Sequence, residues 1–231
     1  MWPRSAGELI DVQRELAVAE AEPWTPPAGA LAVGACAVRF PRGGSGAGAA
    51  GDPAWAAAAV LRGRREVATA VVTGEAGAPY APGLLALREG PLLQAAVAAL
   101  DVVPDVMLVD AGGRDHPRRA GLALHLGAVL GLPTVGVTHR PLLAAGPWPE
   151  DVRGASSPLR LGGEQVGAWV RTRAGARPLA VHPGWRTDVG TAVAVVLAAT
   201  RGHRTPEPLR AARRLAREAR SAPGTARGAL G

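Results

Sequence analysis

The sequence of 231 residues is 48% hydrophobic but only 3% aromatic, which excludes disorder of the whole chain and predicts a core of Ala, Val and Leu. Its 26 basic residues are all arginines and exceed the 19 acidic residues, and the formal net charge of +7 favours polyanionic partners. The single cysteine, Cys36, excludes an intramolecular disulfide framework and a multi-cysteine zinc site, and it favours a reducing compartment.

The hydropathy pattern predicts no secretion signal and no membrane span. The N-terminal segment reaches charge at Arg4 and Glu8 without an apolar stretch. The longest uncharged run, residues 120–138, contains His125, Pro133 and several glycines, so we expect a helix, a turn and a buried strand there. The prediction is a cytoplasmic protein that does not enter a membrane.

The first half of the chain predicts one helix and then three strands. Residues 8–20 place apolar side chains at helical spacing, and the Pro-rich segment after them ends the helix. Apolar stretches of strand length follow at residues 30–40, 56–63 and 66–74, the last two around a turn at Gly63. The short links between these strands predict an antiparallel meander.

The middle of the chain predicts alternating helices and strands. A helical pattern over residues 84–100 contains Pro91, which must kink or restart the helix. A strand at 105–110, a helix over 116–130 and a strand at 133–139 follow. Strand, helix and strand in this order imply a parallel crossover.

The C-terminal third predicts a hairpin, two helices and a tail. The segments are a hairpin of 166–172 and 177–182, a helix near 188–200, a basic helix over 208–220 and a loose tail over 221–231. We find neither an internal repeat nor a change of composition that marks a boundary. The prediction is a single α/β domain over residues 1–220, whose mixed sheet continues an antiparallel meander with parallel strands and is flanked by helices.

Two carboxylates stand out by their position. Asp110 ends an apolar strand beside Gly112 and Gly113, where α/β sheets open onto a ligand crevice, although an Asp that caps a turn also takes such a position. Glu89 precedes Pro91 in a helix, a position that an exposed helix acid also takes. Both are candidate catalytic residues, with the structural alternatives open.

A basic cluster follows Asp110. The run Arg-Asp-His-Pro-Arg-Arg at residues 114–119 surrounds a proline that can start a helix, so the guanidiniums and the helix N-terminus are predicted to face an anion such as phosphate. A solvated basic turn is the alternative. The five histidines of the chain are scattered without metal-ligand spacing.

A glycine-rich segment, residues 41–52, contains a G-x-G-x-x-G match at Gly46, Gly48 and Gly51. The pattern is typical of dinucleotide binding, but so many glycines match it by chance, and residues 53–62 are short for the crossover helix that such a site needs. The chain contains neither G-K-[ST] nor G-x-S-x-G, so we expect neither a P-loop enzyme nor an α/β-hydrolase.

The order of several motifs resembles the endonuclease V family. The motifs run from GACAVRF through PYAPGLLALREGP, VDAGGRDHPRRAGLALHLG, GLPTVGVTH and RGASSPL to PGWRTD and HRTPEP. PYAPG with the following REGP, and HPRR with the downstream GLPT-GV, are the most specific of them. The resemblance implies a ribonuclease H-like fold and a repair enzyme that uses magnesium to nick nucleic acid on the 3′ side of inosine, a deaminated adenine.

The resemblance also implies particular site residues. Two family ligands of Mg²⁺, with Mn²⁺ as an alternative metal, fall on Glu89 and Asp110. The wedge that exposes the base falls on Pro79, Tyr80, Pro82 and Gly83. Tyr80 is the only tyrosine of the chain. Exposing a base costs about a few kcal/mol and costs least at a mispaired lesion, so the wedge helps to select damage. The implied nucleic-acid contacts are Pro79, Tyr80, Pro82, Gly83, Gly113, His116, Arg118, Arg119 and His139.

Three positions depart from the family pattern. Cys36 stands where the strand Asp that would be the third metal ligand is expected, His139 stands in place of a Lys, and Trp185 in place of the His of the G-H-R element. A thiol is mostly protonated at neutral pH and is too soft to replace a carboxylate on Mg²⁺. Asp115 and Asp188 are the acids available to compensate for the lost charge.

The sequence therefore predicts a magnesium-dependent endonuclease V-like nuclease that acts, as a monomer, on DNA or RNA with deaminated bases. The alternative is a catalytically degenerate member that binds inosine-containing nucleic acid without cutting it, through Tyr80 and the pair Arg118 and Arg119. Glu89 and Asp110 favour the enzyme, whereas the departures from the family pattern favour the alternative.

Overall fold

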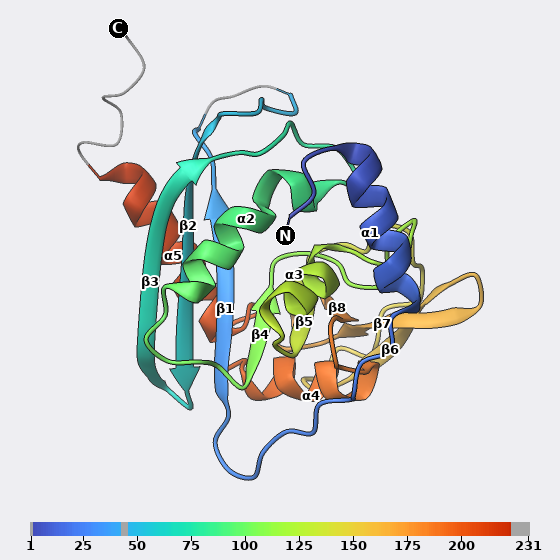
Figure 1. The fold of residues 1–231 in the computed structure, drawn as a ribbon. Helices are drawn as coiled ribbons and strands as arrows, with labels where there is room; N and C mark the ends of the chain where they lie inside the picture. Colours follow the sequence, from blue (N-terminus) through green and yellow to red (C-terminus); the bar gives the residue numbers. More distant parts are fainter. Residues whose placement is uncertain (1, 43–45, 223–231) are drawn as a thin grey trace, which may run out of the picture.

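The structure is a computed structural model that describes residues 2–42 and 46–222, and these residues form one mixed sheet with helices on both faces (Figure 1). The strand order is β3-β2-β1-β4-β5-β8-β7-β6. The strands are β1 (Ala32–Arg39), β2 (Pro53–Arg62), β3 (Arg65–Glu75), β4 (Val106–Val109), β5 (Thr134–Thr138), β6 (Ser156–Leu161), β7 (Glu164–Val170) and β8 (Leu179–Pro183). The helices are α1 (Ala6–Val18), α2 (Leu85–Ala98), α3 (Leu122–Leu130), α4 (Val189–Ala198) and α5 (Glu207–Ser221).

The pairing of the strands confirms the predicted fold class. β1, β2 and β3 form the antiparallel meander, and β1, β4 and β5 run parallel. β8, β7 and β6 continue the sheet in antiparallel pairs, so the predicted hairpin of β7 and β8 is also confirmed. A meander continued by parallel strands and covered by helices is the ribonuclease H-like arrangement that the resemblance implies.

Alternating side chains of the sheet build two cores. In β1, Val33, Ala35 and Ala37 belong to the core under α4 and α5, whereas Cys36 and Val38 belong to the core under α1, α2 and α3. This alternation follows from the period of two in a strand, because neighbouring side chains point to opposite faces. The odd and even positions of β1 therefore face different helices.

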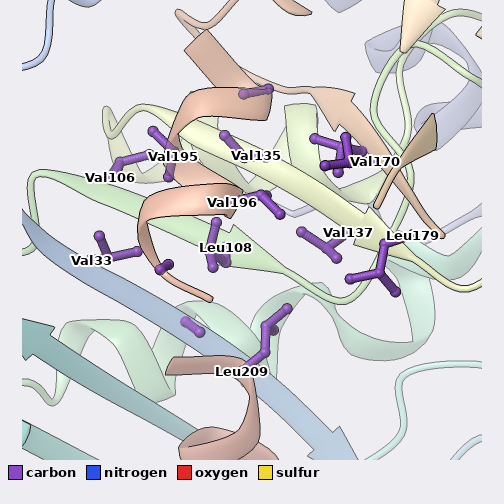
Figure 2. Packing of buried hydrophobic residues seen from close by; sticks show 14 of the residues in the cluster. Val33, Val106, Leu108, Val135, Val137, Val170, Leu179, Val195, Val196 and Leu209 are labelled. Atoms are coloured by element: carbon purple, nitrogen blue, oxygen red, sulfur yellow. The ribbon is translucent and has the colours of Figure 1, made fainter. Parts of the chain in front are cut away.

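Helix α5 is attached to the sheet by a narrow apolar stripe. Leu209, Ala212 and Ala216 lie three and four residues apart and are fully buried. Figure 2 shows Leu209 together with the valines and leucines that the strands and α4 contribute to the same core. Most of the arginines of α5 lie outside this stripe, which leaves them at the surface of the molecule.

The helix predicted from residue 116 begins only at Leu122, so its predicted start was wrong. Residues 114–119 form turns, in which Asp115 and His116 are buried. Gly121 is the N-cap of α3, and a Cβ atom at this position would lie 2.4 Å from the carbonyl oxygen of Gly112. Glycine is therefore required where the chain turns into α3.

Other local predictions also differ from the structure. Pro91 lies inside α2 and does not divide it. Residues 53–62 form β2 and not a helix, which removes the dinucleotide alternative. Strand β6 was missed, although Gly162 and Gly163, with φ of 59° and 83°, form the two-residue turn typical of a hairpin.

Two further predictions concern the C-terminal tail and the absence of a membrane span. Residues 223–231 of the predicted tail lie outside the described residues. In the part of the chain that the structure describes, no helix is both long and apolar enough to cross a membrane.

The attachment of α5 leads to a test of stability. Leu209→Ala removes a fully buried side chain and leaves a cavity, so it should lower the free energy of unfolding by about 2 to 5 kcal/mol. Arg173→Ala, at an exposed position, should change it by less than about 0.5 kcal/mol. Urea unfolding of both variants measures the difference, and equal midpoints for parent and Leu209→Ala would contradict the packing of α5.

Candidate functional site

Three candidate residues meet near the carboxyl ends of β1 and β4. Cys36 pairs with Val109 in the parallel register of these strands, and Asp110 follows Val109 directly. Glu89 reaches the same place from α2. Cys36, Glu89 and Asp110 line a hollow of about 240 Å³, which we name the carboxylate hollow. The structure therefore brings together the three positions that the resemblance assigns to metal ligands.

Asp110 is held by a guanidinium that the sequence did not suggest. Arg213 of α5 donates a hydrogen bond from Nε to Oδ2 of Asp110 at 3.0 Å, and its Nη2 lies 2.7 Å from Oδ1. Both carboxylate oxygens therefore have a charge-assisted partner in the bidentate geometry that arginine favours. The Asp110 and Arg213 side chains are 33% and 16% exposed, so water screens this ion pair only in part.

The other acidic groups of the carboxylate hollow carry little negative charge. Burial and the neighbouring Asp110 raise the pKa of Glu89 to about 8, so its carboxyl is mostly protonated at neutral pH. Burial and the same carboxylate raise the pKa of the Cys36 thiol well above its usual value, and the thiol stays neutral. Arg39 also lines the hollow, where burial lowers the pKa of its guanidinium.

These donors do not fit a magnesium ion. Mg²⁺ prefers hard oxygen ligands, but the third position carries a neutral thiol, and both oxygens of Asp110 already bind Arg213. Within residues 2–42 and 46–222, no three or more His, Cys, Asp or Glu side chains are grouped so that they could hold a metal ion. The metal site that the resemblance implies is therefore incomplete in this chain.

A second hollow of about 220 Å³ adjoins the carboxylate hollow. The two hollows share Tyr80, Leu85 and Asp110. Tyr80 is 49% exposed, and Pro79 and Pro82 beside it are exposed as well. We name this space the wedge hollow, because Tyr80 and Gly83 of the wedge line it. The rest of its lining is mainly apolar.

One side of the wedge is fixed at the carbonyl oxygen of Gly83. This oxygen accepts from Nε2 of Gln13 at 3.0 Å and from Nη2 of Arg118 at 2.9 Å. It also lies 3.1 Å from Nε2 of His116, whose Nδ1 accepts from the backbone N–H of Arg118, so Nε2 carries the proton and donates. Nε of Arg118 bonds to Oε1 of Gln13 at 2.6 Å, which closes the cluster.

The other side of the wedge is fixed by Arg88, which is 5% exposed. Its Nη1 donates to the carbonyl oxygens of Ala78 at 2.6 Å and Ala49 at 3.2 Å, and its Nη2 donates to Asp52 at 3.0 Å. The backbone N–H of Tyr80 donates to the carbonyl oxygen of Ala47 at 2.7 Å. The described part of the glycine-rich segment therefore supports the wedge and is fixed by it.

Gln13 and Arg88 were missed in the sequence. The only signal for Gln13 in the sequence is its place beside the apolar positions of a predicted helix. In the structure its side chain is buried, with 2% of its surface exposed. Arg88 belongs to the REGP motif, but nothing in the motif indicates which groups its guanidinium binds.

The arginines of the run 114–119 bind other parts of the chain and do not face an anion. Arg118 binds Gln13 and Gly83, and Arg119 donates to the carbonyl oxygen of Leu161 at 2.9 Å and lies 3.5 Å from Glu164. The helix start that this prediction used was wrong, because α3 begins only at Leu122, whereas a contact of these arginines with nucleic acid stays a prediction.

Gly113 and His139 take different positions. A Cβ atom on Gly113 would lie 2.0 Å from the carbonyl oxygen of Pro183, so glycine is needed there for packing. His139 is exposed next to the carboxylate hollow, where burial and the nearby Arg204 and Arg213 lower the pKa of its imidazole. His139 therefore stays neutral at neutral pH.

The acids proposed to compensate for Cys36 serve other purposes. Asp188 is the N-cap of α4 and accepts from the backbone N–H of Thr191 at 2.7 Å. Asp115 is 1% exposed, and its carboxylate accepts from three backbone N–H groups. These belong to Leu142, Leu143 and Ala144.

Trp185 lies at the opposite end of the sheet from Asp110. Its backbone N–H donates to Oγ1 of Thr134, which begins β5, whereas Asp110 follows the end of the parallel strand β4. The assignment of Trp185 to the site was therefore wrong, because β8 runs antiparallel and carries the chain away from the site.

Comparison with known proteins identifies similar chains. A sequence model of the family described as Endonuclease V matches residues 43–214. Endonuclease V of Streptomyces coelicolor is 46% identical over 153 residues, or 66% of this chain and 66% of that protein, just under two thirds of its length. Endonuclease V of Roseiflexus castenholzii is 42% identical over 179 residues, which are 77% of this chain and 81% of that protein.

Solved structures show the same similarity. The crystal structure of endonuclease V from Streptomyces avermitilis matches with a TM-score of 0.83 at 38% identity and covers 94% of each chain. The catalytic domain of human endonuclease V matches with a TM-score of 0.81 at 30% identity, covering 94% of this chain and 96% of that one. These matches confirm the resemblance and the fold class that the sequence predicts.

The pKa of Glu89 leads to a test of stability against pH. The pKa of Glu89 is about 8 in the folded chain and 4.5 for an ordinary glutamate. At a pH between these two values, the folded state therefore binds more protons than the unfolded state. Folding stability therefore falls as the pH rises through this window. Glu89→Gln removes this loss. The difference in Tm between the variant and the parent should therefore grow in favour of the variant as the pH is raised from about 5 to about 8. Glu75→Gln, at an exposed position of β3, is the control, and a constant difference for Glu89→Gln would contradict the raised pKa.

Proposed function

Because the chain belongs to the endonuclease V family, we propose that it recognises inosine in DNA or RNA and holds the modified nucleotide without cutting the strand. The observation that carries this proposal is the bidentate ion pair of Arg213 with Asp110. Recognition is assigned to the wedge and the wedge hollow, and the loss of cleavage to the carboxylate hollow.

The wedge supports recognition because it presents an exposed aromatic side chain on a rigid base. Displacing a base from a duplex costs about a few kcal/mol, and stacking on an aromatic ring returns roughly 1 to 3 kcal/mol. Tyr80 is exposed for such stacking, while Arg88 and the cluster at Gly83 fix the backbone on both sides of it. The adjoining wedge hollow of about 220 Å³ offers a mainly apolar space for the displaced base.

The charges of the carboxylate hollow support binding without cleavage. Metal-assisted hydrolysis of a phosphodiester needs ionised ligands that hold the metal and a metal-bound water that attacks the phosphorus. In this chain Glu89 is mostly protonated, Cys36 is a neutral thiol and Asp110 is neutralised by Arg213. The negative charge that would attract Mg²⁺ or Mn²⁺ is therefore largely absent.

The second candidate is the metal-dependent cleavage 3′ to inosine that the sequence predicts. One observation favours it: Glu89 and Asp110 line the same hollow and are close enough for Asp110 to raise the pKa of Glu89. A carboxylate pair of this kind is a partial ligand set for a divalent cation. In this alternative, Glu89 and Asp110 are the catalytic ligands and Arg213 must leave Asp110.

One experiment separates the two candidates. Inosine-containing and unmodified oligonucleotides, as DNA and as RNA, are incubated with the chain in EDTA, in Mg²⁺ and in Mn²⁺, and both affinity and nicking are measured. A preference for inosine in EDTA without nicking in either metal supports the proposal. Nicking next to inosine that requires a metal supports the second candidate, and equal affinity for all oligonucleotides contradicts inosine recognition.

The role of Tyr80 can be tested by its removal. Tyr80→Ala should weaken binding to inosine-containing duplex by roughly 1 to 3 kcal/mol and binding to undamaged duplex much less, because stacking acts only where a base is displaced. Trp148→Ala removes another exposed aromatic ring, which lines neither hollow, and should change neither affinity. Equal losses on both duplexes in fluorescence anisotropy would remove the wedge from the proposal.

The missing chemistry can be restored in two positions. Cys36→Asp supplies the third carboxylate, and Arg213→Ala frees both oxygens of Asp110. The double variant should nick inosine-containing duplex in Mg²⁺ at least about tenfold faster than the parent, which corresponds to roughly 1.4 kcal/mol, and more than either single variant. It should also melt earlier than the parent in EDTA and regain stability with Mg²⁺. A double variant that gains neither metal binding nor nicking would show that the defect lies elsewhere.

A further inference from the structure

We infer that a groove along α5 binds the sugar-phosphate backbone of the nucleic-acid strand that leaves the carboxylate hollow, and that it does so without a metal ion. The groove has a volume of about 680 Å³. Its polar lining consists of Arg39, Glu66, Glu207, Arg210, Arg213, Arg214 and Arg217. The inference takes from the proposed function only that the ligand is a nucleic acid.

The arginines of α5 form a stripe. Arg210, Arg213, Arg214 and Arg217 are separated by three, one and three residues, a spacing that places them on one side of a helix. Leu209 and the buried alanines of α5 attach the other side to the sheet. The stripe therefore has a fixed position on the molecule, and Arg39 at the end of β1 lines the same groove.

A stripe of charge on a helix is often only a solvated face, but two arginines here have no acidic partner. Arg210 is paired with Glu207 at 3.3 Å and Arg214 with Glu66 at 3.5 Å. Within the described residues the side chain of Arg217 has no hydrogen bond or ion pair. The side chain of Arg39 has one hydrogen bond, to the carbonyl oxygen of Val38 at 2.7 Å.

Like charges are crowded around Arg39. Burial lowers the pKa of its guanidinium most. The nearby Asp110 raises this pKa, and three neighbouring arginines lower it, namely Arg213, Arg217 and Arg220. Asp110 is the acid within this group, and its charge is already matched by Arg213. Guanidiniums that outnumber the acidic groups among them, as Arg39 and Arg217 do here, bind an anion favourably, and a phosphodiester matches their geometry. The ligand chemistry of the groove is therefore that of phosphate.

The groove continues the site described above. Arg39 lines both the groove and the carboxylate hollow, and Asp110 lines both the carboxylate hollow and the wedge hollow. The three spaces thus meet in one order, from Tyr80 past Asp110 to Arg39 and α5. A strand whose modified nucleotide lies at Tyr80 passes its next phosphates into the groove on one side. This continuity distinguishes a nucleic-acid path from an isolated site for a free phosphate ion.

The test compares two charge-matched double variants. Arg210→Gln with Arg217→Gln removes two guanidiniums from the groove, and Arg160→Gln with Arg173→Gln removes two exposed guanidiniums from distant parts of the chain. Binding of a single-stranded inosine oligonucleotide is measured in EDTA over a range of salt concentrations. The groove variant should reduce the slope of log affinity against log salt by about 0.7 for each lost phosphate contact, and the control variant should leave it unchanged.

Shortened oligonucleotides locate the effect. One set lacks the nucleotides 5′ to inosine and the other lacks those 3′ to it. The affinity lost in the groove variant should disappear in one set and persist in the other, because the strand enters the groove on one side only. Loss in both sets, or the same slope as in the parent, would overturn the inference. Inorganic phosphate as competitor distinguishes a simple anion site, which it would block at low millimolar concentration.

Two controls keep the outcome independent of folding and of the proposed function. Arg217→Gln alone loses no protein partner and replaces the double variant if the latter melts early. The same titrations with adenine in place of inosine measure base preference separately. A parent without inosine preference contradicts the proposed function, while the salt slopes still decide whether the groove binds the backbone.

Discussion

The ion pair between Arg213 and Asp110 holds a guanidinium at the central carboxylate of the candidate site. It joins the last helix to the end of β4, over a separation of 103 residues in the chain. Around this pair, burial first and the charge of Asp110 second raise the pKa of Glu89 to about 8 and keep the Cys36 thiol neutral. The carboxylate that Arg213 binds thus influences two buried neighbours, and the ion pair depends in turn on the apolar stripe that attaches α5 to the sheet.

The wedge illustrates how a surface loop becomes rigid. Gly83 has a φ of +77°, a conformation that favours glycine, and its carbonyl oxygen receives hydrogen bonds from α1 and from the turn before α3. Arg88 fixes the segment before Tyr80 in the same way. The conformational entropy of the loop is lost when the chain folds, so binding does not have to order it again. In the proposed function, rigidity of this kind increases the difference in affinity between a displaced and a stacked base.

The features that the sequence predicted are those encoded locally or by motif. Strand-length apolar segments predict the meander and the crossover, and the motifs place Glu89, Asp110 and Cys36 in one hollow. The partners of the arginines could not be predicted, because a guanidinium in a basic run suits solvent, phosphate or a backbone carbonyl equally well. Arg118 binds Gln13 across 105 residues of chain, and no local pattern reports such a contact. Trp185 was misplaced because a motif gives the order of residues but not the direction of the strand that precedes them.

A guanidinium and a divalent cation can both neutralise a phosphate, but they differ in what they do to water. A bound metal lowers the pKa of a water ligand and supplies the nucleophile, whereas a guanidinium only donates hydrogen bonds and has no open coordination position for water. In the proposed function, the residue that balances the charge of Asp110 therefore supplies no means of activating water. With Arg39 beside it and the arginines of α5 beyond it, this end of the sheet offers the proposed nucleic-acid ligand guanidiniums in place of a metal. In the proposed function, binding without a metal and the absence of cleavage both follow from a site in which guanidiniums balance the negative charge.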